Sequence, residues 1–137
     1  MSISASSTLV ERDPARLLRT ALRIDALASG LIGLVLLIDS APLSRLLNLP
    51  ASLLLGAGAV LAVYAVGLVW LQRSARLSRP AAWTVVVLNA LWLVASIGLL
   101  LVGWIKPNLL GVAFVIAQAA AVLVFAEMQY FGLKRLR

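Results

Sequence analysis

Four long apolar segments occupy most of the sequence, and their length limits what the chain can fold into. They run from about Leu17 to Ile38, Ala51 to Leu71, Ala81 to Ile105 and Asn108 to Phe131. A helix needs roughly 20 apolar residues to cross the hydrocarbon core of a bilayer. Hydrophobic residues make up 63% of the chain and charged residues only 12%, whereas soluble domains average about 45–50% and about 25%. The sequence therefore predicts an all-α membrane protein with a four-transmembrane-helix bundle.

The segments between the apolar runs set the expected boundaries. We expect one integral membrane domain over residues 1–137, with helices at about 13–38, 51–72, 81–105 and 108–132. Prolines flank three of these helices, as is typical where a helix begins or a connection turns. Residues 1–12 are expected to form a flexible tail. Residues 40–49 are expected to hold a short interfacial helix with its leucines on one face, or else a plain loop.

The distribution of Lys and Arg predicts the orientation. Ten of the twelve lie in the N-terminal region, the second connection and the C-terminus, and only Arg45 and Lys106 lie on the other side. Because cytoplasmic segments are enriched in Lys and Arg, both termini are expected in the cytoplasm. The net charge of +7 is spread over short connections and not gathered in one patch, so no nucleic-acid partner is expected.

Two further patterns concern helix packing. The segments 23–27 and 87–91 resemble each other, and so do 32–34 and 97–99, which suggests two pseudo-repeated hairpins of the same orientation. Small residues such as Gly33 and Gly58 recur within the apolar runs at spacings that allow two helix backbones to approach closely. Helix contacts are therefore expected at these positions, within one chain or between chains.

Four arginines near the N-terminus form a stripe. At about 100° per residue, their spacing places them within about 60° of arc on one helix face. These candidate lipid-headgroup contacts are Arg12, Arg16, Arg19 and Arg23. Anionic lipids are the expected partner of such a stripe, since each nearby basic side chain is attracted by about 1 kcal/mol. A simpler interpretation is that the arginines only fix the topology and extend toward the interface.

Three polar residues fall within the apolar runs near their cytoplasmic ends. Asp25, Asn89 and Glu127 lie at similar expected depths and form a candidate intramembrane cluster. Intramembrane carboxylates are costly and are usually paired, protonated or functional. The cluster could join helices through hydrogen bonds, or it could bind a proton, a cation or a small polar solute. Gln118 points about 180° away from Glu127, so both are not expected to face the same interior.

Histidine and cysteine are both absent, which limits the chemistry available. We therefore expect no catalytic residues, no cofactor and no metal site with these ligands. The sequence favours a non-enzymatic accessory or structural protein of the bacterial inner membrane that forms a homo-oligomer or binds a larger membrane protein. The alternative is a small oligomeric transporter or channel that uses the intramembrane cluster.

Overall fold

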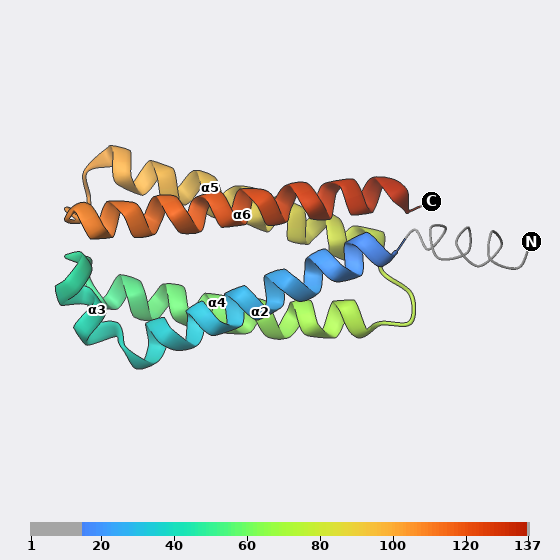
Figure 1. The fold of residues 1–137 in the computed structure, drawn as a ribbon, viewed down its shortest axis with the longest axis horizontal. Coiled ribbons are helices and arrows are strands. Elements are labelled where there is room, and N and C mark those ends of the chain that lie inside the picture. Colours follow the sequence, from blue (N-terminus) through green and yellow to red (C-terminus); the bar gives the residue numbers. More distant parts are fainter. Residues whose placement is uncertain (1–14, 137) are drawn as a thin grey trace, which may run out of the picture.

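The computed structural model describes residues 15–136, and within them the chain forms five helices (Figure 1). The helices are α2 (Arg16–Ile38), α3 (Ser40–Leu47), α4 (Ala51–Arg73), α5 (Arg79–Val102) and α6 (Leu109–Arg135). The four long ones contain 23 to 27 residues and are apolar enough to cross a membrane. At 1.5 Å per residue each is longer than the roughly 30 Å hydrocarbon core. The predicted all-α fold with four long apolar helices is therefore confirmed.

The long helices form two antiparallel hairpins (Figure 1). The first joins α2 to α4 through the short helix α3, and the second joins α5 directly to α6. α2 packs against both α4 and α6, while α5 packs mainly against α6. The two ends of the described chain lie at the same end of the bundle as the α4–α5 loop, and α3 lies at the opposite end. We call the end with the α4–α5 loop the basic end.

Local sequence explains where α5 and α6 begin and end. The Ser78 side chain accepts a hydrogen bond from the Ala81 amide, and Asn108 accepts one from the Gly111 amide, so both act as N-caps. α5 ends at Val102, three residues before the expected boundary, because Gly103 adopts a left-handed conformation with φ of 76°. α6 instead extends to Arg135, beyond the expected end at residue 132.

Glycines bring the helices together. A Cβ atom added at Gly58 of α4 would lie 2.9 Å from the Gly33 carbonyl oxygen of α2, so the two backbones are in direct contact. The expected approach of helices at these two small residues therefore occurs within one chain. The predicted helix in segment 40–49 is also present, as α3, and its Leu47 is buried.

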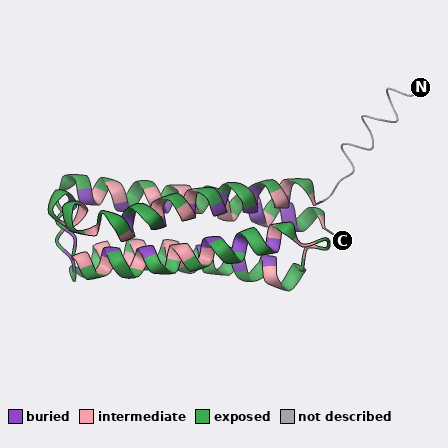
Figure 2. Cartoon of the chain, turned by 90° about the horizontal axis from the view of Figure 1, so that it is seen from below, coloured by how far each residue is buried: buried purple, intermediate pink, exposed green. Residues whose placement is uncertain are grey.

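The exposure of side chains is the reverse of that in a soluble bundle. Large apolar side chains are exposed along all four long helices, among them Trp70 (82%), Leu101 (80%) and Leu109 (86%). Figure 2 shows exposed residues along the whole length of the bundle. By contrast, Asp25, Asn89 and Gln129 are buried. The expected tail at residues 1–12 and the Arg12 contact lie outside the described residues.

Candidate functional site

Asp25 lies inside the bundle, at the level where all four long helices approach one another. Only 1% of its surface is exposed. Ser29, one turn later on α2, donates a hydrogen bond of 2.9 Å to Oδ1 of the Asp25 carboxyl group. This local bond orients the carboxyl group and leaves its second oxygen facing the other helices.

The second oxygen, Oδ2, is approached from three helices. The Tyr64 hydroxyl of α4 lies 2.8 Å away, and the Asn89 Nδ2 of α5 lies 3.1 Å away. The Gln129 Nε2 of α6 donates a bond of 2.7 Å. A single carboxyl group of α2 therefore joins α4, α5 and α6. We call Asp25, Ser29, Tyr64, Asn89 and Gln129 the Asp25 network.

The remaining contacts of the Asp25 network connect its members to one another. Asn89 Nδ2 donates 2.8 Å to the Gln129 Oε1, and the Tyr64 hydroxyl lies 2.9 Å from the Asn89 Oδ1. The four partners of the carboxyl group are all uncharged. Among residues 15–136, every buried side-chain nitrogen or oxygen has a hydrogen-bond partner. Each buried polar atom of the network therefore has at least one partner within the protein.

One hydroxyl group of the Asp25 network, that of Tyr64, faces two acceptors. The Tyr64 hydroxyl has a single proton but lies within hydrogen-bond distance of two acceptors, Asp25 Oδ2 and Asn89 Oδ1. The hydroxyl group therefore donates to only one of these two oxygens at a time.

Two of the three residues of the predicted cluster come together. Asp25 and Asn89 are in direct contact, whereas Glu127 lies on the exposed side of α6. Gln129 takes the expected place of Glu127. The two residues lie about 200° apart around the helix, because each residue advances the helix by about 100°, so only one of them can face the interior.

Sequence reasoning missed two members of the Asp25 network. Gln129 lies eleven residues after Gln118, a separation that returns a helix to within about 20° of the same face, so the pair of glutamines indicated an interior polar stripe. Tyr64 lies within the apolar run of α4, away from the interfaces where tyrosine is usually enriched in membrane proteins. A tyrosine at that position needs a partner for its hydroxyl group.

A second polar group lies farther along the bundle, between α5 and α6. The Trp92 Nε1 donates a 2.8 Å bond to the Gln118 Oε1, and the Gln118 Nε2 donates a 3.1 Å bond to the Ser96 hydroxyl. Ser96 in turn donates to the Trp92 carbonyl oxygen. Gln118 therefore faces α5, in agreement with the expectation that it does not share the side of Glu127.

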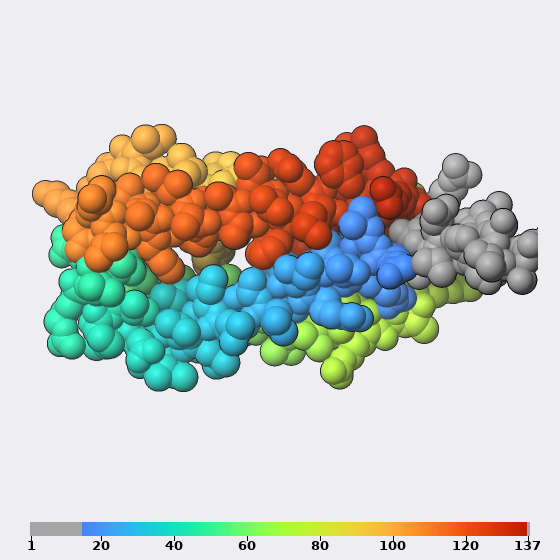
Figure 3. All heavy atoms as spheres, viewed as in Figure 1, coloured from blue at the N-terminus to red at the C-terminus, as the bar shows by residue number. Residues whose placement is uncertain are grey.

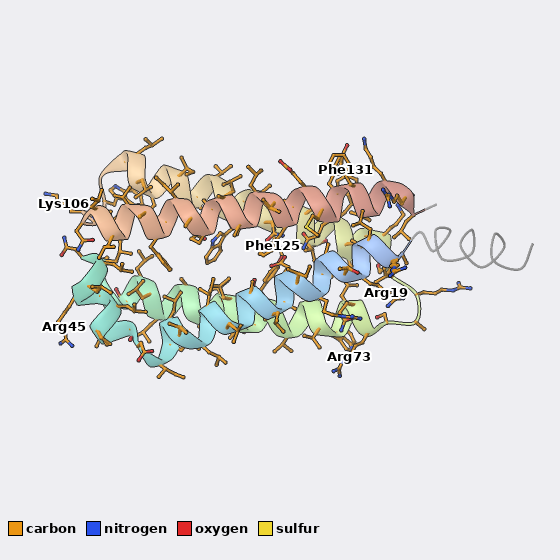
Figure 4. All side chains as sticks on the ribbon, viewed as in Figure 1. Arg19, Arg45, Arg73, Lys106, Phe125 and Phe131 are labelled. Carbon is orange, nitrogen blue, oxygen red and sulfur yellow. The ribbon has the colours of Figure 1, made fainter. Side chains whose placement is uncertain are left out.

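The arginine stripe divides into different environments. The Arg19 guanidinium group donates to the Gln72 and Ala75 carbonyl oxygens, at 2.6 and 3.2 Å. It therefore satisfies carbonyl groups at the C-terminal end of α4. Arg16 and Arg23 are exposed. Figure 4 shows Arg19 and Arg73 toward the basic end, and Arg45 and Lys106 at the opposite end.

Four long apolar helices with exposed hydrocarbon side chains and a buried polar network define a multi-pass membrane protein in contact with the lipid bilayer. Within residues 15–136, no three His, Cys, Asp or Glu side chains gather as metal ligands would. Comparisons of the chain with protein-family models, curated proteins and solved structures found no match.

Proposed function

We propose that this chain is a non-enzymatic accessory component of the bacterial inner membrane, which associates with a second copy or a larger membrane protein through α5. The observation that carries the proposal is the burial of the helices. In the most apolar stretch of α5 only 11% of the residues are buried, against 39% in that of α2. Of the four long helices, α5 therefore leaves the largest share of its apolar stretch unburied and available to a partner within the membrane.

The exposed side of α5 has a shape that suits helix association. Leu91, Val94 and Leu101 are 59%, 68% and 80% exposed. Gly98 lies among them, and a Cβ atom added there would meet no atom within 4 Å. A glycine between large apolar side chains forms a notch in which a second helix can approach closely.

Cysteine cross-linking in native membranes tests the association, because the chain has no natural cysteine. We expect Val94→Cys to form cross-linked adducts, and Gly98→Leu to reduce them. Val63→Cys is the matched control, since Val63 is 75% exposed on α4. The mass of the adduct distinguishes a second copy from another protein. Equal cross-linking at the two positions, or none at either, would contradict the proposal.

The orientation that goes with this proposal places the basic end in the cytoplasm, with N-in and C-in termini. The support is the distribution of cations, since among residues 15–136 only Arg45 and Lys106 lie at the opposite end (Figure 4). Exposed Arg16 and Arg23 would then contact anionic headgroups. We expect their replacement by glutamine to reduce co-purified anionic lipid, and replacement of Arg45 to leave it unchanged. A reporter after residue 137 that proves to be periplasmic would overturn the orientation.

A second candidate is a small proton transporter or channel, and the buried carboxyl group of Asp25 favours it. Intramembrane carboxyl groups are a usual element of proton relays. The test is proton flux into proteoliposomes under an imposed potential, measured with a trapped pH-sensitive dye. Flux that disappears with Asp25→Asn while the protein remains folded would support transport. Flux no greater than in empty liposomes would contradict proton transport and leave the accessory function as the proposal.

A further inference from the structure

A cavity of about 450 Å³ lies between the two hairpins. It is visible in Figure 3 as a hollow between α2 and α6, and Figure 4 shows Phe125 between the hairpins. All four long helices contribute to its wall. Representative residues are Ile32, Ala57, Leu99, Phe114, Val122 and Phe125.

The cavity exists because the hairpins touch closely near their two ends. Toward the basic end, a Cβ atom at Gly132 of α6 would lie 2.8 Å from the Leu18 Cα of α2. Toward the other end, Gly111 of α6 lies against the Leu47 carbonyl group of α3, and a Cβ atom there would collide with its oxygen. Between the Asp25 network and the Gly111 contact, the side chains of the wall leave this space open.

The cavity continues sideways. A second hollow between α4 and α5 is lined by Val63 and Leu88 and shares Ser29, Val60 and Trp92 with the first. α4 packs on α2 and α3, and α5 packs on α6, so these two helices leave space between them. Since both are apolar candidate membrane spans, this opening faces hydrocarbon chains of the bilayer.

The chemistry of the wall selects an apolar occupant. Trp92, Ser96 and Gln118 lie at the wall, but they form hydrogen bonds with one another. Ser29 donates to Asp25. Water in a cavity needs two to four polar partners, whereas apolar cavities accept apolar molecules. The volume falls within the range of about 300–1,000 Å³ that is typical of small-molecule sites.

We propose that this cavity binds one hydrocarbon chain of a membrane lipid, which enters between α4 and α5. The chain would restore the dispersion contacts that the wall residues lack across the cavity. An acyl chain of a phospholipid and the isoprenoid tail of a quinone share this chemistry. The proposal goes beyond the accessory function, because it holds whichever protein α5 contacts.

Trp92 provides a direct probe, because it lines both the cavity and the side opening. The full chain with Trp70, Trp83 and Trp104 replaced by phenylalanine is purified in detergent and titrated with a phospholipid brominated midway along one acyl chain. We expect quenching of Trp92 fluorescence that saturates at one chain per protein. A parallel titration with an isoprenoid quinone distinguishes the source, since the preferred ligand displaces the other.

Two glycines of α4 give matched variants. Gly56 lines the cavity and Gly67 does not, and a Cβ atom at either would meet nothing within 4 Å. They lie eleven residues apart, within about 20° on the same helix face. Gly56→Phe, which displaces two or three methylene groups of the ligand, should weaken binding roughly tenfold or more. Gly67→Phe should leave binding unchanged.

A second variant, Ala95→Phe on α5, approaches the same cavity from the opposite side and should also weaken binding. If circular dichroism shows that Gly56→Phe does not fold, Ala95→Phe still tests the proposal. Quenching that rises without saturation, or that is the same in the cavity variants and in Gly67→Phe, would show that lipid contacts Trp92 only nonspecifically. That result would overturn the proposal.

Discussion

Gly132 of α6 lies directly against the backbone of Leu18 of α2, where an added Cβ atom would lie 2.8 Å from the Leu18 Cα and 2.9 Å from its nitrogen. Because backbone atoms cannot move aside as a flexible side chain can, this contact fixes the distance between the hairpins. We expect Gly132→Ala to lower the free energy of unfolding by about 1–3 kcal/mol, the usual cost of overpacking. Reversible unfolding in mixed micelles of detergent and dodecyl sulfate, followed by circular dichroism, measures it.

Gly67→Ala is the control for that experiment. Gly67 is also helical, but an added Cβ atom would meet nothing within 4 Å, so stability should be unchanged or slightly greater. Equal loss of stability in both variants would show that the contact between Gly132 and Leu18 does not limit the approach of the hairpins.

Arg19 is expected to stabilise the fold through the carbonyl groups of Gln72 and Ala75. We predict that Arg19→Gln lowers the free energy of unfolding by about 0.5–1.5 kcal/mol, the net value of typical hydrogen bonds. Arg23→Gln should change it by less than about 0.5 kcal/mol, because Arg23 is exposed. The same unfolding assay compares the two variants. If Arg23→Gln costs as much as Arg19→Gln, the capping of α4 is not what Arg19 contributes.

Hydropathy predicted the four long helices because a span needs uninterrupted apolar residues whatever its neighbours are. The boundaries were less accurate where a single residue decides them. Gly103 ends α5 through its positive φ, but glycine also occurs inside helices of this chain, at Gly33 and Gly58 for example. Only the tertiary structure distinguishes these positions.

The candidate site could be predicted only in part. Asp25 and Asn89 meet because they lie at similar depths in the bundle. Counting residues along each helix from the basic end estimates this depth. The expectation for Glu127 favoured a charged residue over the neutral Gln129, although an uncharged amide is less costly to bury. Tyr64 was not predicted, because the apolar sequence of α4 does not indicate which way the hydroxyl group points.

Tyr64→Phe tests how much the tyrosine hydroxyl group contributes to the Asp25 network. The variant removes the hydroxyl group that approaches Asp25 and Asn89 and keeps the ring. We expect a loss of about 0.6–1.7 kcal/mol in unfolding free energy, as for interhelical hydrogen bonds in membranes. In the Asp25→Asn background the same change should cost less, because contacting residues are coupled. Additive losses would contradict the direct contact.

One buried carboxyl group, that of Asp25, joins all four long helices. Asp25→Asn tests it most directly, since it preserves shape but replaces one of the two acceptor oxygens by an NH₂ group. Either the Ser29 hydroxyl or the donors from Asn89 and Gln129 then lose their acceptor. The unfolding assay should show a loss of about 1–3 kcal/mol, whereas Asp39→Asn, at an exposed aspartate, should change stability by less than about 0.5 kcal/mol. Equal stabilities for the two variants and the natural chain would contradict the account.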